Sequence, residues 1–244
     1  TKIFLMIKYN KYLFFLLLVV SLGLLYSFAS ERNLQKKVTD VKIEFSGENT
    51  NFLTISMVDK LLIQNTETVR NLKKSVIDLY GLEDQVNKNP YVAESSVFLH
   101  INGTIKTIVK QRSPIARVLH EDTSYYIDKQ GVKMPLSPVH SARVLLLSGV
   151  EKAEEFKEIV ALVTIILEDD FLKKEIVEIH KLDNEEYQFS VRSGNYKIDF
   201  GKLINIDIKF KKLKALYNKA FLDKTIHEYK TINVKFHNQV VCTK

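Results

Sequence analysis

The feature that most constrains this chain is an uncharged apolar run near its N-terminal end. Residues Tyr12 to Ala29 read YLFFLLLVVSLGLLYSFA, which is 18 residues without a charge. At about 1.5 Å of rise per residue, a helix of this length extends about 27 Å, close to the hydrocarbon thickness of a bilayer. Because lipid offers no partners for unpaired backbone groups, the run is predicted to form one transmembrane helix over residues 12–29.

The residues before this run predict its orientation. Lys2, Lys8 and Lys11 precede it without any acidic residue, so the positive-inside rule predicts that residues 1–11 form a short cytoplasmic tail. A cleaved signal peptide is the alternative, because Ser27-Phe28-Ala29 fits a small-x-small cleavage site. The apolar run exceeds the usual signal core of about 7–15 residues, which favours an uncleaved anchor. Both interpretations place the remaining residues outside the cytoplasm.

The net charge of +7 is unevenly distributed along the chain. Residues 1–37 carry +5, residues 38–200 carry −5, and residues 201–244 carry +7. The chain is therefore two basic ends around an acidic middle and not a general polycation, and no nucleic-acid-binding motif accompanies the lysines. A single cysteine, Cys242, excludes an internal disulfide framework and any multi-cysteine metal site.

The first hundred residues after the anchor are predicted to form a strand, two helices and two strands. The first strand covers Val38–Ser46, and a capping-box pattern at Ser56 and Asp59 starts the first helix. Asp78 begins the second helix, which Asn89-Pro90 ends. The last two strands are alternating runs joined by Asn102-Gly103, a pair typical of a type I′ turn. Asn102-Gly103-Thr104 is also a glycosylation sequon, and the hairpin explains the same residues.

The second half is predicted to be rich in short strands. They are listed here with the two helices among them: strands 115–119, 125–127, 142–147, 176–181, 187–191, 196–200 and 231–241, and helices 156–167 and 207–217. The acidic runs Glu168-Asp169-Asp170 and Asp183–Glu186 are interpreted as solvated turns between them.

The sequence offers no positive support for catalysis. The six histidines are scattered without metal-ligand spacing, and neither a nucleophile elbow nor a glycine-rich phosphate loop is present. Cys242 lies in an apolar strand, where packing explains it better than nucleophilic chemistry. The prediction is a protein that is not an enzyme, with no cofactor, no metal and no catalytic residue.

The lysine-rich C-terminal segment has two competing interpretations. A solvated helix face is one, and a surface for anionic lipid heads, acidic cell-wall polymer or an acidic protein partner is the other. The last predicted strand, Thr231–Val241, is expected at a sheet edge, where unpaired N–H and C=O groups can bind another chain. Lys235 and Phe236 alternate along it as candidate charged and apolar anchors.

The order of these elements resembles the FtsQ/DivIB family of bacterial cell-division proteins. The resemblance rests on Val41–Gly47, on Asn89-Pro90-Tyr91-Val92 with the following hairpin, and on Gln111-Arg112-Ser113-Pro114-Ile115-Ala116, which resembles the family's Q-R-x-P-x-A motif. Tyr126-Ile127-Asp128 with Gly131 resembles its Y-x-D-x-x-G motif. IDFGKL at residues 198–203, the basic helix and TINVKFHNQVV resemble the family's closing segments in order and spacing. The segment 231–241 lacks the tryptophan expected in the family's partner-facing strand.

The resemblance implies an α+β architecture: a single N-terminal transmembrane helix, a POTRA domain of β-α-α-β-β order, and a mostly antiparallel β domain with flanking helices. It implies a POTRA domain over residues 38–112 and a β domain over residues 113–244, which ends in the partner-binding strand.

The implied function is a non-enzymatic bitopic scaffold of the divisome, in the bacterial inner membrane at the septum. It would link early and late division proteins, including the septal peptidoglycan synthase complex, and bind FtsB/FtsL-type partners by β-augmentation. The implied partner-binding residues are Thr231, Asn233, Lys235, Phe236 and Asn238, with Lys211 and Lys212 as receptors for acidic groups. A POTRA-containing envelope chaperone or translocation component is the alternative, and a cell-wall enzyme is a further one.

Overall fold

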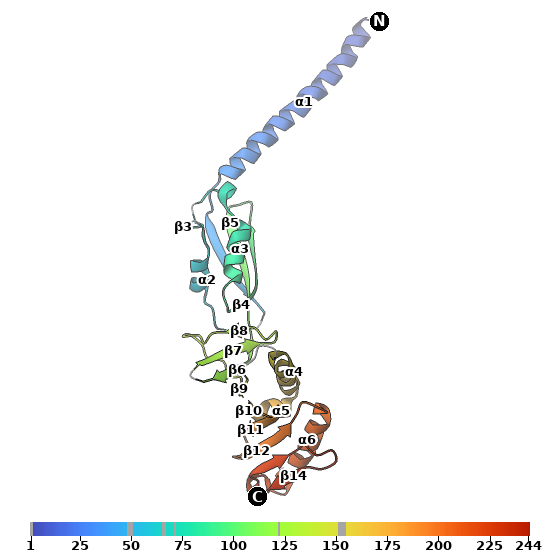
Figure 1. Ribbon diagram of the computed structural model, residues 1–244. Helices are drawn as coiled ribbons and strands as arrows, with labels where there is room; N and C mark the ends of the chain where they lie inside the picture. Colours follow the sequence, from blue (N-terminus) through green and yellow to red (C-terminus); the bar gives the residue numbers. More distant parts are fainter. Residues whose placement is uncertain (1, 48–50, 65–66, 71, 122, 151–154) are drawn as a thin grey trace. The chain divides into compact units, whose positions relative to one another are not determined.

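The computed structural model describes residues 2–47, 51–64, 67–70, 72–121, 123–150 and 155–244. The chain divides into two compact units, one of residues 1–49 and 53–111 and the other of residues 50–52 and 112–244 (Figure 1). The junction follows Gln111, within the Gln111–Ala116 segment.

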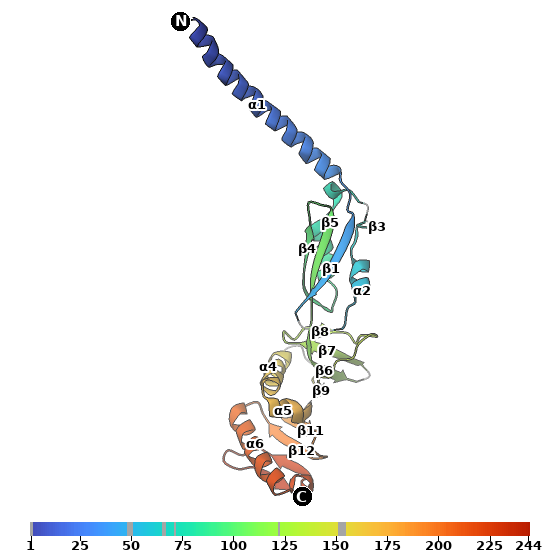
Figure 2. The same ribbon diagram turned by 180° about the vertical axis from the view of Figure 1, so that it is seen from behind.

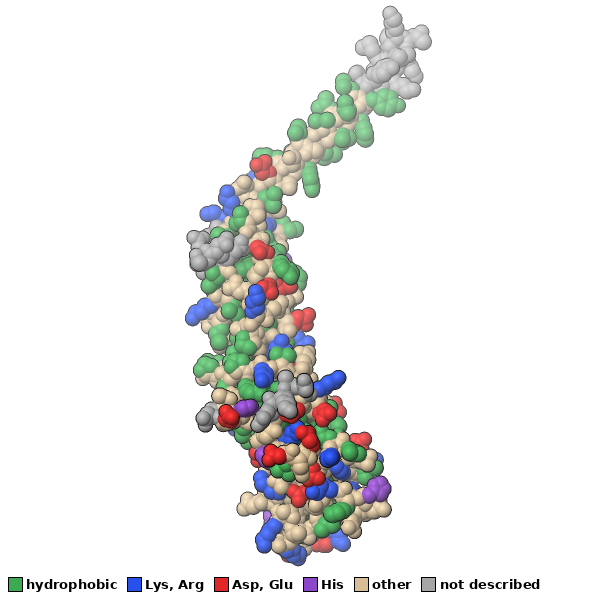
Figure 3. Space-filling view, viewed as in Figure 1, with side chains coloured by type: hydrophobic (Ala, Val, Ile, Leu, Met, Phe, Trp, Pro, Cys, Tyr) green, Lys and Arg blue, Asp and Glu red, His purple; other side chains and the backbone are tan. Residues whose placement is uncertain are grey.

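A long apolar helix begins the chain. Helix α1 covers Lys2–Gln35. Its stretch Tyr12–Gln35 is long and apolar enough to cross a membrane, and none of its most apolar residues is buried in the protein. Exposed apolar side chains occupy consecutive positions from Tyr12 to Val20 and therefore every face of the helix, and Figure 3 shows those on one face. A helix that is apolar on every face requires an apolar surrounding, which agrees with the predicted membrane helix over residues 12–29.

The remainder of the first unit has the predicted order of strand, helix, helix, strand and strand. Its three-stranded sheet has the order β1-β5-β4, with β1 (Asp40–Ser46) parallel to β5 (Thr104–Gln111) and β4 (Val92–Leu99) antiparallel to β5. The helices are α2 (Ile55–Leu61) and α3 (Leu79–Asn87). Three short elements between the helices were not predicted: β2 (Ile63–Gln64), β3 (Glu67–Thr68) and the 3-10 turn η1 (Lys74–Val76).

Two local predictions in this unit need correction. The N-cap of α2 is Thr54, whose hydroxyl accepts from the Met57 N–H, and not Ser56. The β4–β5 loop is not a two-residue type I′ turn, because the His100 carbonyl accepts from the Gly103 N–H and only Gly103 in the loop has a positive φ, of 92°. One glycine is enough for this three-residue loop. The Asp78 cap of α3 is confirmed by a 2.9 Å hydrogen bond from the Gly81 N–H.

The second unit is built on a nine-stranded mixed sheet of order β14-β13-β12-β11-β10-β9-β6-β7-β8. Its strands are β6 (Pro114–His120), β7 (Thr123–Asp128), β8 (Lys133–Met134), β9 (Leu145–Ser148), β10 (Ile176–Lys181), β11 (Tyr187–Val191), β12 (Lys197–Gly201), β13 (Thr231–Asn233) and β14 (Val241–Thr243). Within the described residues, five of the neighbouring pairs are antiparallel and three are parallel. The mostly antiparallel prediction therefore holds.

Three helices cover one face of this sheet: α4 (Glu155–Glu168), α5 (Asp170–Glu175) and α6 (Ile206–Leu222), which lie on the same side in both ribbon views (Figures 1 and 2). Their apolar residues, among them Ile159, Leu172 and Leu213, form one buried core with the inward residues of the strands. Helix α5 was not predicted, since Glu168-Asp169-Asp170 was interpreted as a turn. Asp169 instead caps α5 by accepting from the N–H groups of Phe171 and Leu172.

Candidate partner-binding edge

The C-terminal segment forms a hairpin, which corrects the prediction of one strand over Thr231–Val241. Strand β13 ends at Asn233, and β14 returns antiparallel to it with Ile232 opposite Cys242. β13 is parallel to β12, so β14 alone forms this edge of the nine-stranded sheet. The chain turns back in the polar segment after Asn233. A strand that ran on to Val241 would extend beyond β12, which pairs with β13 only as far as Asn233.

The seven residues predicted to bind a partner therefore lie in three different settings. Thr231 and Asn233 are on β13, where β14 already pairs with them. Lys235, Phe236 and Asn238 lie in the connection between β13 and β14 and not on a strand. Lys211 and Lys212 lie on α6.

Lys212 binds the β13–β14 connection. Its ammonium donates to the main-chain carbonyl of Val234 at 3.0 Å and also to that of Phe236. The structure thus brings Lys212 and Phe236 together, as the resemblance implied, but gives the lysine a local partner. Lys211, one residue earlier, is exposed and forms no ion pair with any described residue.

A second pair anchors the start of the connection. The Lys235 ammonium lies 3.1 Å from a Glu186 carboxylate oxygen, and the hydrogen bond from Lys235 holds the pKa of Glu186 below its usual range. The Lys235 N–H donates to the Asn233 side chain at 3.0 Å. Because both side chains are partly exposed to solvent, this ion pair adds little to the free energy of unfolding and mainly fixes the position of the connection.

Sequence reasoning missed Lys209, which lies beneath this surface. It is only 8% exposed, its ammonium donates to the Lys202 carbonyl at 2.6 Å, and it lies 4.8 Å from the centre of the Phe200 ring. Burial lowers the pKa of Lys209, and the neighbouring Lys212 and Lys235 lower it further. The three ammonium groups are therefore close enough to interact, and the Glu186 carboxylate partly offsets their charge.

The exposed features of this edge are apolar and cationic. The Phe236 side chain is 48% exposed, Val241 on β14 is 37% exposed, and Asn238 is exposed between them. Thr231 and Thr243 hydrogen-bond across the two strands through their hydroxyl groups. The polar run His237-Asn238-Gln239 is compatible with a turn, but the alternation along Thr231–Val241 predicts a continuous strand.

A buried polar cluster fixes α6 against the sheet behind this edge. The Glu175 carboxylate accepts hydrogen bonds from the hydroxyls of Tyr196 at 3.3 Å, Tyr217 at 3.0 Å and Ser193. Burial raises the pKa of Tyr196 to about 12 and raises that of Tyr217 as well. The cluster joins α5, the connection between β11 and β12, and α6, so it holds the helix that carries Lys211 and Lys212.

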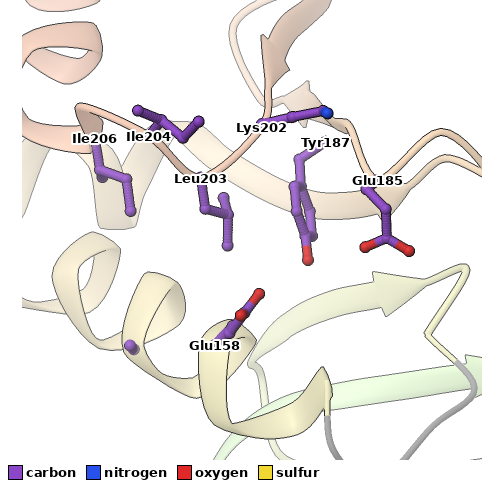
Figure 4. Close-up of a pocket in the computed structure, with 8 residues that line it drawn as sticks. Glu158, Glu185, Tyr187, Lys202, Leu203, Ile204 and Ile206 are labelled. Carbon is purple, nitrogen blue, oxygen red and sulfur yellow. The ribbon is translucent and has the colours of Figure 1, made fainter.

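A groove of about 460 Å³ lies beside the start of α6, lined by residues of α4, β11 and the connections that precede β11 and α6. Figure 4 shows Tyr187 between Glu158 and Glu185, with Leu203 and Ile206 further along the groove. Burial raises the pKa of the Tyr187 hydroxyl. Among the described residues, no group of three or more histidine, cysteine or acidic side chains is arranged to hold a metal ion.

Comparison with known proteins decides the family. The family model described as FtsQ/DivIB, C-terminal related, matches residues 113–243, which is more than half of the chain and nearly all of the second unit. The chain belongs to the FtsQ/DivIB C-terminal related family. The family is one of cell-division proteins and is generally non-enzymatic, and helix α1 fits a membrane-anchored member of it.

Two further comparisons complete these findings. A search of curated proteins finds no match. Among solved structures, the chain is similar to the major extracytoplasmic domain of the trans isomer of the cell-division protein DivIB from Geobacillus stearothermophilus, with 14% identity and a TM-score of 0.30. That match covers 47% of this chain and 97% of the other.

Proposed function

We propose that this FtsQ/DivIB-related chain is a non-enzymatic bitopic scaffold of the bacterial divisome. In this proposal, residues 1–11 are a cytoplasmic tail and residues 12–29 cross the inner membrane. Residues 38–112 form a POTRA domain, residues 113–244 form the partner-binding β domain, and both lie outside the cytoplasm at the septum. The scaffold links early and late division proteins and thereby reaches the septal peptidoglycan synthase complex.

The observation that supports partner binding most directly is the edge strand β14. Among the strands of the described residues, the three residues of β14 pair with β13 alone, so their outer edge is available to a further strand. Backbone pairing at a sheet edge gives affinity with little demand on sequence, and neighbouring side chains give selectivity. We propose that an FtsB/FtsL-type partner adds a strand at this edge, with Phe236 as the apolar anchor.

The residues predicted from sequence take distinct roles in this proposal. Lys211 receives an acidic group of the partner, whereas Lys212 and Lys235 hold the β13–β14 connection that presents Phe236 and Asn238. Thr231 and Asn233 support β14 from the next strand. Charges at the rim of such an interface mainly affect association rate and partner choice.

Capture of partners from the membranes of the source bacterium tests this function. The full chain, solubilised in detergent, is compared with Val241→Pro, which removes a backbone N–H and the extended pairing of β14. Recovery of FtsB/FtsL-type proteins with the unmodified chain and their loss with Val241→Pro is the expected result. A Val139→Pro variant is the control, because Val139 is exposed outside the strands of the same unit. Equal recovery with Val241→Pro and Val139→Pro contradicts binding of the partner at β14. Failure of the unmodified chain to recover any division protein contradicts the proposed scaffold function.

A further inference from the structure

The end of α1 is joined to the β4–β5 hairpin within the first unit. The Lys74 ammonium donates to the Asn33 side chain in the last turn of α1 at 3.2 Å and to the Ile101 carbonyl at 2.9 Å. The Thr39 N–H donates to the Gly103 carbonyl at 3.0 Å. A Cβ atom added at Gly103 would lie 2.8 Å from the Lys37 carbonyl oxygen, so the two backbones are in close contact. The hairpin loop therefore lies beside the end of the apolar helix.

This attachment sets the depth of the hairpin loop relative to a bilayer. Asn33 is four residues beyond Ala29, the end of the uncharged run, which corresponds to about 6 Å along the helix. The polar interface of a bilayer is about 5–7 Å thick on each side. If α1 crosses the bilayer, Asn33 is at headgroup depth, and the hydrogen-bonded Lys74 and Ile101 are held at the same level.

The residues around this junction have the composition of a membrane-contacting surface. We call them the membrane-proximal collar, and they are Lys36, Lys37, Lys73, Lys74, Val76 and Ile101. Ile101 is 80% exposed and Val76 is 54% exposed, so both present apolar surface at the level of the four lysines. An interface between lipid headgroups and acyl chains accommodates this combination of apolar and cationic side chains.

The charge of the collar also points to a partner. Lys36, Lys37 and Lys73 are exposed and form no ion pair with any described residue. The carboxylates nearest in sequence, Glu31, Asp40 and Asp78, are also exposed, and the four lysines outnumber them. Lysines beside exposed apolar side chains match an anionic lipid surface, where each adjacent lysine strengthens binding by about fivefold.

We propose that the membrane-proximal collar binds anionic phospholipid headgroups and that Ile101 enters the interface beside them. The first unit is thereby held against the membrane, and not left free to swing about the end of α1. This inference requires that α1 crosses the bilayer, and it does not depend on binding of a partner at β14.

A single fluorescent label tests the proposal on the full chain in lipid nanodiscs. Replacing Cys242 by serine leaves no cysteine, and Ser75→Cys then places one in the exposed part of the collar. Ser46→Cys is the matched control, because Ser46 is exposed at the far end of β1, about 20 Å of strand from Asp40. The nanodiscs contain phosphatidylcholine with or without phosphatidylglycerol, and a trace of lipid with a nitroxide-labelled headgroup quenches nearby fluorophores.

The expected result is at least twofold stronger quenching at position 75 than at position 46 in nanodiscs that contain phosphatidylglycerol. The triple variant Lys36→Glu/Lys37→Glu/Lys73→Glu is expected to abolish the part of the difference that depends on phosphatidylglycerol. Lys74 is kept because it holds the hairpin, and this attachment accounts for any difference in phosphatidylcholine alone. Equal quenching at the two positions, or a phosphatidylglycerol-dependent difference that survives the triple variant, overturns the proposal. Co-flotation with liposomes checks insertion separately, and a chain that does not float removes α1 as a spanning helix and the proposal with it.

Discussion

Replacing Phe236 by alanine tests the proposed partner edge most directly. Phe236 keeps 48% of its surface exposed at the β13–β14 connection. An aromatic side chain buries about 150–250 Å², so about 100 Å² of Phe236 is left for a partner to cover. At about 25 cal/mol per Å², covering this area contributes about 2.5 kcal/mol, most of which alanine removes. We therefore expect Phe236→Ala to weaken binding by about 2 kcal/mol, or roughly thirtyfold in Kd.

The assay is titration calorimetry of the full chain in detergent against the FtsB/FtsL-type partner recovered from membranes. Phe221→Ala is the matched control, because Phe221 is also a phenylalanine, is 45% exposed and lies at the end of α6, where its ring contacts Tyr217. Its affinity for the partner should not change. An unchanged affinity for Phe236→Ala, with circular dichroism showing an intact fold, refutes the assignment of Phe236 to the interface.

Three further predictions concern charge, pH and backbone geometry. Lys211→Glu should slow association severalfold at low salt and reduce its salt dependence, and Lys219→Glu on the same helix should not, as stopped-flow measurements check. Because Tyr196 has its pKa raised to about 12, from an ordinary 10 in the unfolded chain, the unfolded state loses its proton first. The free energy of unfolding should then fall by about 2 kcal/mol between pH 10 and pH 12, more with Tyr217, and urea titrations of Tyr196→Phe should show a shallower loss. Gly149→Ala should destabilise the fold by about 2–4 kcal/mol in thermal unfolding, since Gly149 has a φ of 74° and an added Cβ would lie 2.0 Å from a β10 carbonyl oxygen.

Much of the fold follows from local sequence signals. The apolar run before Ser30 requires a helix in any surrounding that lacks water. Asp78 marks the start of α3 and Asn89-Pro90 follows its end. Alternation predicted β4 and β5 because one face of each strand is buried and the other is solvated. These signals act within about ten residues, so they predict local structure without knowledge of the rest of the chain.

Errors occurred where a distant contact decides the structure. Asp169 was interpreted as part of a solvated turn, but it caps α5 and forms an ion pair with Lys214 on α6, which lies 45 residues later. The β13–β14 hairpin likewise depends on Lys212, whose ammonium binds the connection from another element. Neither partner is visible from local periodicity.

The candidate site divides in the same way. Sequence alone determined that the chain has a membrane-type helix, an α+β fold and a basic C-terminal segment that contains Lys211, Lys212 and Phe236, because composition and periodicity encode burial and charge. Only the tertiary structure decided that β14 is the edge strand, that Lys212 is occupied by main-chain carbonyls, and that Lys209 is buried beneath them. The reason is physical: strand order, hydrogen-bond partners and the exposure of a lysine depend on residues that are far apart in sequence and become neighbours only when the chain packs.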